Sequence, residues 1–537
     1  MILRIIAQKK SNRISVKSKT ALGKAALGLS IVAVFSKVFG FAEKLIVAHF
    51  FGTGAQADVY FASMGIVLSV VFLVKELVYP SVLPVFAGAL KTSFAASSAL
   101  FKKAFSFFAV ILVALAFIMI VFSDTITAVL VPGFSEDKKL LTSSLLRYFA
   151  PGCLFLCMGT LTYTILNCRR SFLKAAVPEA AFKFMVATGL VILAPFMGIY
   201  AQALALTIAS AMLFIAQLFF IPEARVLLAP NSYTPEGETK KILTLMGPLV
   251  LGVVFSHISG LVDNMLASTL PTGQLSFLGY SKKLIDAILL VGPVALVTVV
   301  YSQLSHLNTE GEINKFKGLF IKALRLILFV SIPTSVVLIM LREPIVATLF
   351  ERGNFTAQST IGTSQALLIY STGLVTFAVE TLVVYSFYAL SNTKVPVRAG
   401  VFGVLLDIIL AGSLVGPFGF AAIAGAYVCS KTIKVIILLL IMHRKFRFAY
   451  QGRFINFIVK VIAASSLSAF ALFILKNMDA GGSFIWTAIF DLAVPAAGFG
   501  IIFAGCCVLL KIEELGYLSA VLLRRKGFKQ QLTGDKI

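Results

Sequence analysis

Charged side chains are scarce in this chain. Asp, Glu, Lys and Arg make up 13% of its 537 residues, whereas hydrophobic residues make up 59% and the mean hydropathy is +0.97. A soluble domain usually has about a quarter of its residues charged. Acidic residues are the rarer kind, 23 against 47 Lys and Arg, which leaves a formal net charge of +24. The composition excludes a soluble enzyme or binding domain and indicates an integral membrane protein.

Motifs of common membrane-bound enzymes are missing as well. The sequence has no G-x-x-x-x-G-K-[ST] stretch, so we expect no nucleotide site, and no paired His or Cys spacing suggests a metal ion. All six cysteines lie in or beside hydrophobic segments, which argues against a disulfide framework. The expected outer loops are too short to present the acidic residues of a glycosyltransferase or ligase. We therefore expect no enzymatic activity and no cofactor.

Hydrophobic segments account for most of the chain. We count fourteen, each near or above the ~20 residues that cross a bilayer as a helix. They cover about 25–51, 57–88, 104–131, 141–168, 175–195, 198–221, 242–270, 275–304, 318–350, 359–391, 395–416, 418–442, 454–475 and 483–510. The predicted fold class is an all-α polytopic membrane protein with 14 transmembrane helices.

The distribution of Lys and Arg predicts the orientation. If the N-terminus is cytoplasmic, the basic residues of the N-terminus, of every second loop and of the C-terminal tail are cytoplasmic too. The opposite loops hold only Lys138, Lys139, Arg342, Arg352 and Lys476. This alternation continues through all fourteen segments, so both termini should be cytoplasmic. The net charge is thus a signal for topology and anionic lipids, and we expect no nucleic-acid partner.

A faint internal repeat divides the chain. Phe35-Ser36-x-x-x-Gly40-x-x-Glu43 recurs 220 residues later with Asp263 in the last place, and Gly133 recurs as Gly353. Transporters are commonly built from such repeats, with the substrate site between them. The predicted parts are a basic cytoplasmic N-terminus (1–24), a six-helix lobe (25–221), a cytoplasmic linker (222–241), a second six-helix lobe (242–442), two additional helices (443–510) and a basic cytoplasmic tail (511–537).

Ionisable residues inside the spans indicate a site, because a Lys or Asp at the bilayer centre costs about 2.5–3.5 kcal/mol even on the lenient insertion scale. They concentrate in the first, second, seventh and eighth segments, whereas segments three, five, six and thirteen are poor in them. A water-filled cavity lined by the four rich segments would accommodate them. The candidate substrate-binding residues are Lys37, Glu43, Lys44, Asp58, Lys75, Glu76, Lys282 and Lys283.

Five lysines in one cavity would favour an anion such as a phosphate or pyrophosphate. The alternative is that lysines and acids only neutralise each other, as the helical spacing of Lys282 and Lys283 to Asp286 permits. Asp58 has its own alternative, a helix cap beside a glycine-containing turn.

Further acids lie in the second half. Asp407 and Glu380 have no obvious neighbouring cation in the sequence, and Lys431 and Lys434 are expected to extend towards the cytoplasmic surface. Asp263 and Asp407 are the candidates for holding a coupling monovalent cation, and a hydrogen-bonded carboxyl is an equal alternative for Asp407. Without a nucleotide site, transport must use an ion gradient, the membrane potential or substrate flux.

Three stretches are similar to motifs of a known family. They are Ser36-Lys37-Val38-Phe39-Gly40-Phe41 with the following Ala48-x-x-Phe51-Gly52-x-Gly54-x-x-x-Asp58; Leu349-Phe350-Glu351-Arg352-Gly353-x-Phe355-Thr356; and Tyr388-Ala389-Leu390 through Thr393-Lys394-Val395-Pro396-Val397. They resemble the lipid II flippase family MurJ (MviN), part of the multidrug/oligosaccharidyl-lipid/polysaccharide (MOP) exporter superfamily. The likeness covers essentially the whole chain.

The resemblance implies a carrier of lipid II, a lipid-linked peptidoglycan precursor, between the leaflets of the bacterial cytoplasmic membrane. It implies two six-helix lobes around a cationic cavity, and a groove at the last two helices for the polyprenyl tail. The implied partners are a polyprenyl-pyrophosphate-linked glycan and membrane lipids. The resemblance also implies that Lys37 and Lys283 bind phosphate and that Asp58 is essential.

The chain departs from the family's pattern at three cationic positions. Glu43-Lys44 stands where the family has an arginine, Lys75 lies one turn from a second such position at Val71, and Lys282-Lys283 replaces Asp-Arg. The positive charge is kept, but the bidentate arginine fork is lost. The alternative functions are therefore export of another polyprenyl-linked polysaccharide unit or small-molecule antiport within the same superfamily.

Overall fold

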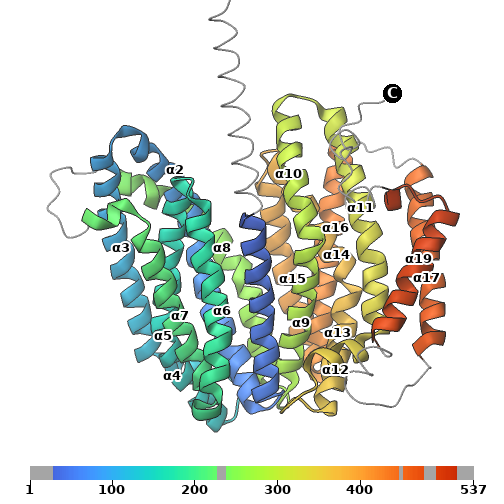
Figure 1. Cartoon of the computed structure of the whole chain (residues 1–537), viewed down its shortest axis with the longest axis horizontal. Helices are drawn as coiled ribbons and strands as arrows, with labels where there is room; N and C mark the ends of the chain where they lie inside the picture. The colour runs from blue at the N-terminus through green and yellow to red at the C-terminus, as the bar shows by residue number, and fades with distance from the viewer. Residues whose placement is uncertain (1–27, 227–237, 447–451, 477–491, 517–537) are drawn as a thin grey trace, which may run out of the picture. The chain divides into compact units, whose positions relative to one another are not determined.

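The computed structural model describes residues 28–226, 238–446, 452–476 and 492–516 (Figure 1), and within these ranges it contains helices and turns but no strand. The predicted N-terminal segment (1–24), most of the predicted linker (222–241) and most of the predicted tail (511–537) lie outside the described residues. The all-α prediction is confirmed for the described part of the chain.

The first half begins with a helix that includes residues 28–51. It continues with α2 (Ala55–Thr92), α3 (Phe94–Val121), α4 (Ser123–Leu130), α5 (Glu136–Cys168), α6 (Phe172–Met197) and α7 (Tyr200–Phe219), followed by the short 3₁₀ helix η1 (Pro222–Val226). Ser93 begins α3 in an extended conformation, and its hydroxyl accepts a hydrogen bond from the Ala96 N–H at 3.0 Å. Such a cap satisfies one of the N–H groups that have no partner within the helix.

The second half begins with α8 (Glu238–Ser268). It is followed by α9 (Gln274–Val291), α10 (Pro293–Thr309), α11 (Ile313–Met340), α12 (Arg342–Phe350), α13 (Ala357–Thr372), α14 (Leu374–Ala389), α15 (Lys394–Phe418), α16 (Phe420–Phe446), α17 (Gly452–Lys476) and α19 (Val494–Leu509).

Nine helices in the described part of the chain are long and apolar enough to cross a membrane, or eleven if two bent pairs each count as one span. Large apolar side chains point outward from the helices: Phe196 and Phe219 are 84% and 78% exposed, and Leu509 of the shorter α19 is 81% exposed. Such exposure is costly in water and normal in lipid, where the hydrocarbon chains are as apolar as the side chains. The chain is therefore a multi-pass membrane protein.

Four of the expected continuous segments are broken in the structure, between α3 and α4, α9 and α10, α11 and α12, and α13 and α14. The pair α9–α10 bends by 42° at Gly292-Pro293, because a proline at the start of a helix has no N–H to continue the preceding one. The pair α13–α14 bends by 44° at Gly373, where a Cβ atom would come within 2.8 Å of a Val428 side-chain carbon on α16. Periodicity alone could not predict these breaks.

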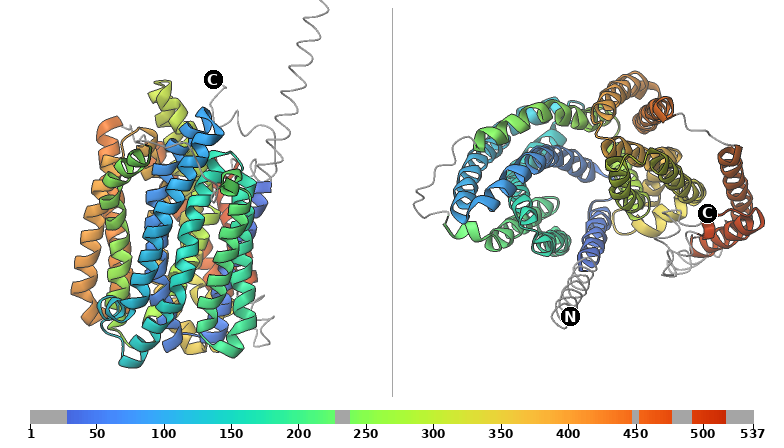
Figure 2. Two further views of the ribbon diagram at one scale, coloured as in Figure 1. Left: turned by 90° about the vertical axis from the view of Figure 1, so that its left-hand side faces the viewer. Right: turned by 90° about the horizontal axis from the view of Figure 1, so that it is seen from above.

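The described helices form two compact units. Unit 1 comprises residues 28–50, 62–130 and 134–257, and unit 2 comprises residues 51–61, 131–133 and 258–516 apart from the undescribed stretches. In unit 2, α17 and α19 lie side by side (Figures 1 and 2) and pack on α11, where the rings of Phe329 and Phe503 are 5.5 Å apart. The Arg325 guanidinium contacts the Glu514 carboxylate at 2.5 Å beside this pair.

Two short turns from the first half of the sequence belong to unit 2, and both approach its backbone closely. Gly52 has φ +57°, and its carbonyl accepts a hydrogen bond from the Tyr280 hydroxyl at 2.8 Å. The Gly133 N–H donates to the Ser268 hydroxyl at 3.1 Å. A Cβ atom at Gly133 would lie 2.4 Å from the Thr269 Cα, so only glycine fits there without displacing backbone.

Replacing Gly133 with Ala should destabilise unit 2, because the new methyl group must displace the Thr269 backbone. We expect a loss of about 1–3 kcal/mol, the usual cost of forcing an extra carbon into a packed site. Thermal unfolding of the purified full-length protein would measure it. Gly88→Ala is the matched control, because a Cβ atom there has nothing within 4 Å. Equal melting temperatures for the two variants would contradict this assignment.

Candidate functional site

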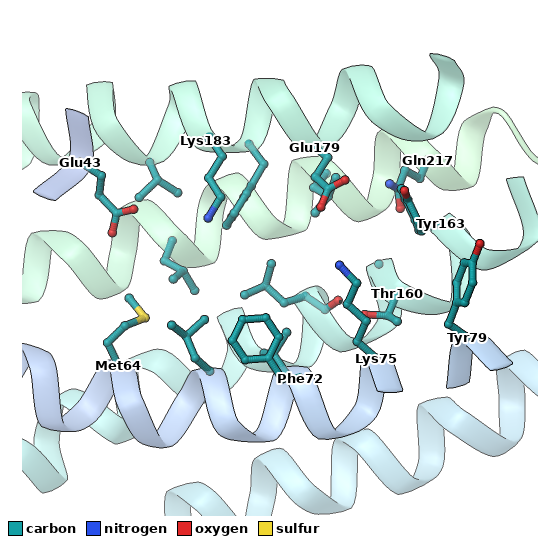
Figure 3. A pocket seen from close by; sticks show the side chains of 18 of the residues that line it. Glu43, Met64, Phe72, Lys75, Tyr79, Thr160, Tyr163, Glu179, Lys183 and Gln217 are labelled. Carbon is teal, nitrogen blue, oxygen red and sulfur yellow. Dashed lines mark hydrogen bonds between the residues drawn. The ribbon is translucent and has the colours of Figure 1, made fainter. Parts of the chain in front are cut away.

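Unit 1 contains a cavity of about 180 Å³. Its walls come from the first helix and from α2, α5, α6 and α7, and Figure 3 shows how the side chains point into it. We call it the unit 1 cavity. Three of the predicted residues line it, namely Glu43, Lys44 and Lys75, whereas Glu76 does not.

Glu43 and Lys44 are both buried, although they are adjacent in sequence. The Lys44 ammonium donates to the Glu43 carboxylate at 2.9 Å, and the Gln202 amide donates to the same oxygen at 2.8 Å. For this pair, the structure supports the alternative that a lysine and an acid neutralise each other. A pair held in this way lowers the cost of keeping both charges away from water.

Lys75 and Glu76 are exposed on α2 and make different contacts. The Lys75 ammonium lies 5.9 Å from the centre of the Tyr163 ring. The Glu76 carboxylate is 3.6 Å from His257 Nε2, and the His257 ring stacks on Phe72 at a centroid distance of 6.0 Å. Glu76 therefore contacts α8, whereas Lys75 points into the unit 1 cavity (Figure 3).

Sequence reasoning missed two charged residues of this cavity. Glu179 and Lys183 both lie on α6 and line the unit 1 cavity opposite Lys75 (Figure 3). The prediction that segment five was poor in ionisable groups drew attention away from them. The sequence did contain a signal for them. Both residues lie within a predicted span and are one helical turn apart, so they share one face of the helix.

Lys37 is exposed on the first helix and is not among the residues that line the unit 1 cavity. The five predicted lysines belong to different units: Lys37, Lys44 and Lys75 to unit 1, and Lys282 and Lys283 to unit 2.

In unit 2, Lys282 and Lys283 point in different directions. The Lys282 ammonium lies 3.8 Å from the centre of the Tyr427 ring and lines a cavity of about 160 Å³ together with Asp286, Tyr370 and Glu380. Lys283 does not line this cavity, and its ammonium is 3.9 Å from the Asp286 carboxylate. Cations are attracted to the face of an aromatic ring, so Tyr427 stabilises Lys282 inside the unit.

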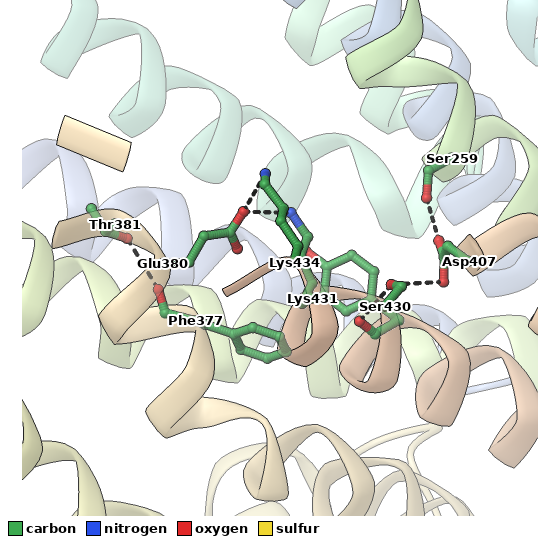
Figure 4. A network of polar contacts seen from close by, with 9 residues as sticks. Ser259, Phe377, Glu380, Thr381, Asp407, Ser430, Lys431 and Lys434 are labelled. Carbon is green, nitrogen blue, oxygen red and sulfur yellow. Dashed lines mark hydrogen bonds and ion pairs between the residues drawn. The ribbon is translucent and has the colours of Figure 1, made fainter. Parts of the chain in front are cut away.

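The expectation that Lys431 and Lys434 extend towards the cytoplasmic surface is wrong. Both ammonium groups contact one oxygen of Glu380, at 3.2 and 2.6 Å (Figure 4). Glu380 thus has two neighbouring cations, although the sequence suggested none. They come from the next-but-one helix of the chain, α16, which packs against α14. Two lysines on one acid leave a local positive excess at Glu380.

Asp407 is a hydrogen-bonded carboxyl, one of the two alternatives that the sequence allowed. It accepts hydrogen bonds from the hydroxyl groups of Ser259 and, at 3.4 Å, Ser430 (Figure 4). Asp263 lies on α8 one turn after Ser259, and the charge of Lys282 acts on both acids. Asp407 therefore has lysines nearby, although the sequence suggested none.

Asp58 is almost fully buried in unit 2, 1% exposed, and caps another helix. Its carboxylate accepts hydrogen bonds from the N–H groups of Gly273, at 2.8 Å, and Ser276, at 3.0 Å, and from the Ser276 hydroxyl at 2.6 Å. Gly273 has φ +97° and precedes α9. A carboxylate at a helix N-terminus satisfies free N–H groups and interacts favourably with the helix dipole. Asp58 therefore acts as a helix cap, as the alternative allows, and the capped helix is α9.

Comparison with known proteins gives a consistent result. The model of the family described as "Lipid II flippase MurJ" matches residues 47–490. A probable lipid II flippase MurJ of Buchnera aphidicola subsp. Acyrthosiphon pisum is 26% identical over 464 residues, covering 85% of this chain and 90% of that protein. The probable lipid II flippase MurJ of Vibrio cholerae is 26% identical over 517 residues, covering 93% and 95%.

Solved structures share the fold. A lipid II flippase MurJ in an inward closed conformation superposes with a TM-score of 0.77 at 24% identity, covering 90% of this chain and 99% of that one. An inward-facing multidrug resistance MATE family transporter of the MOP superfamily gives 0.67 at 14% identity, covering 77% and 94%. The family is one of transporters rather than enzymes. Because the family model spans most of its length, this chain belongs to the lipid II flippase MurJ family.

Proposed function

We propose that this chain is a lipid II flippase, which carries the peptidoglycan precursor from the cytoplasmic to the outer leaflet of the bacterial cytoplasmic membrane by alternating access. The observation that carries the proposal is the family match over residues 47–490. The match to whole relatives supports it, since the chain covers 90% and 95% of two proteins that bear this name.

The chemistry of the cavities supports an anionic lipid-linked substrate. Lys44 and Lys75 line the unit 1 cavity, and Lys282 lines the cavity of unit 2. Ammonium groups at membrane depth suit a polyprenyl-pyrophosphate-linked glycan, whose anionic groups need cationic partners when they leave water. The polyprenyl tail would lie along the apolar surface of α17 and α19, among membrane lipids.

We further propose fourteen spans with both termini in the cytoplasm. They comprise the nine long apolar helices, the bent pairs α9–α10 and α13–α14, the helix that includes residues 28–51, α8, and a last span ending with α19. The alternation of Lys and Arg between the loops supports this orientation. The proposed lobes are 25–221 and 242–442, and the additional helices occupy 443–510.

Backbone conformation supports a repeat between the two proposed lobes. Arg170 (φ 55°) and Ser391 (φ 56°) lie 221 residues apart, and each follows the helix before the proposed fifth or eleventh span. A positive φ is uncommon for residues other than glycine, so the coincidence is informative. Gly198 (φ 55°) and Gly419 (φ 57°) are also 221 residues apart, and each ends the helix of such a span.

A second candidate is a flippase for another polyprenyl-linked polysaccharide unit, or a small-molecule antiporter of the same superfamily. Lys282-Lys283 in place of Asp-Arg favours it, because lysine lacks the fork that binds a phosphate through two hydrogen bonds. Growth of a lipid II flippase depletion strain that expresses this chain would separate the candidates. Rescue is expected for a lipid II flippase, and failure despite normal membrane insertion would favour the second candidate.

Replacing Lys37 or Lys283 with Ala should abolish rescue of that strain while leaving the protein in the membrane. The reason is that each is proposed to bind the substrate pyrophosphate, so removing its charge removes a phosphate contact. Arg at either position should be tolerated better. Lys103→Ala, an exposed lysine on α3, serves as the control. Full rescue by both Ala variants would show that neither lysine is needed for phosphate binding.

Asp58→Asn should stop transport. The carboxylate holds the N-terminus of α9 in the present state, and we propose that it releases α9 and pairs with a lysine in another state. An asparagine keeps one acceptor oxygen, replaces the other with an NH₂ group that cannot accept from an N–H donor, and lacks the charge for the second pairing. Flipping in proteoliposomes measures the effect, with the exposed Asp137→Asn as control. Normal flipping by Asp58→Asn would leave Asp58 as a cap of α9 alone.

Flipping should slow when the membrane potential is collapsed. Each elementary charge carried across 100 mV contributes ~2.3 kcal/mol, and the excess lysines of the cavities supply such charges. We propose Asp263 and Asp407 as the residues that hold a coupling cation in unit 2. Proteoliposomes with and without a potential or an ion gradient test both statements. Unchanged flipping without either driving force, together with unchanged flipping by Asp263→Asn and Asp407→Asn, would refute the coupling scheme.

A further inference from the structure

Three charged side chains meet at the unit 1 cavity without neutralising one another. Lys75 of α2 faces Glu179 and Lys183 of α6 across the cavity (Figure 3). In the described part of the chain none of the three makes an ion pair or a hydrogen bond through its charged group. Lys75 contacts the Tyr163 ring at 5.9 Å and Lys183 the Phe182 ring at 5.0 Å.

Glu179 and Lys183 do not form the ion pair that their spacing on α6 allows. A glutamate followed four residues later by a lysine is the spacing that favours an ion pair on a helix. Other acids of the protein use the cations within their reach, as Glu43 does with Lys44 and Glu380 with Lys431. Lys183 also lies eleven residues into α6, about 16 Å along its axis and thus near the middle of the ~30 Å hydrocarbon layer. Charges kept separate at that depth are expensive and usually functional.

The charges and size of the cavity restrict its occupant. The two ammonium groups and the carboxylate together have a net charge of +1. A complementary ligand therefore has one net negative charge and at least one hydrogen-bond donor for Glu179. A neutral sugar does not need two lysines, and a pyrophosphate would bring several negative charges next to Glu179. The cavity of about 180 Å³ is too small for a whole lipid-linked head group. Phe72, Tyr79 and Tyr163 supply flat apolar walls.

We propose that the unit 1 cavity is a subsite for the peptide part of the lipid-linked precursor. A peptide carboxylate would lie between Lys75 and Lys183, and a peptide N–H group would donate to Glu179. This inference rests on the proposed function, because peptidoglycan precursors carry a short peptide on their glycan. It makes Glu179 and Lys183 specificity-determining residues, distinct from the lysines that bind the pyrophosphate.

Two lipid probes that differ only in the peptide test the proposal. One is the undecaprenyl-pyrophosphate-linked disaccharide with its peptide, and the other is the same lipid without the peptide. Binding to the full-length protein in phosphatidylethanolamine–phosphatidylglycerol nanodiscs is measured for each. The wild-type protein should prefer the peptide-bearing lipid about tenfold, the scale of one lost hydrogen bond to a charged group.

Lys183→Ala and Glu179→Gln should lose this preference while binding the peptide-free lipid as the wild-type protein does. Their unchanged binding of the peptide-free lipid excludes a folding defect, Lys183→Arg should keep most of the preference, and Lys103→Ala on α3 is the surface control. Equal binding of both lipids by the wild-type protein, or a preference retained by both variants, would overturn this inference and leave the proposed function standing. Binding of neither lipid would overturn the proposed function and the inference with it.

Discussion

The cost of placing an ionised group in hydrocarbon governs the arrangement of this protein. Buried charges are tolerated where a partner satisfies them, as in the contacts of Glu43 with Lys44 and Gln202 or of Glu380 with Lys431 and Lys434. The same rule makes the exceptions conspicuous. Around the unit 1 cavity, Lys75, Glu179 and Lys183 keep their charges apart, and a site for a polar ligand explains why.

Much of the architecture could be predicted from the sequence because membranes restrict structure so strongly. With no water to satisfy backbone groups, long apolar segments must be helices, and their length follows from the bilayer. The breaks in these helices do not follow from hydrophobicity, although the one at Gly292-Pro293 is marked by its proline. The bend at Gly373 depends on how closely α16 approaches, which is a property of packing and leaves no local signal.

The candidate site was predictable only at the level of residue types. Lys282 and Lys283 are adjacent in sequence, but successive residues of a helix point about 100° apart, so one enters a cavity and the other pairs with Asp286. A count of charged residues in each segment did not single out Glu179 and Lys183. Two charged residues on one helical face can form a site even where the whole span contains few charges. Asp58 was identified correctly as important and capable of capping, but its partner lies more than two hundred residues away in the chain.

Two helices are divided between the compact units. The first seven residues of α2, Ala55–Phe61, belong to unit 2 and the rest to unit 1, whereas α8 passes from unit 1 to unit 2 after His257. A chain cut between residues 227 and 237 would therefore not release two independent folding units. The first fragment would lack the part of α8 that completes unit 1, and would retain segments 51–61 and 131–133, which complete unit 2. Expressed as two polypeptides, the halves should need each other to fold, so fragment complementation would succeed only on co-expression.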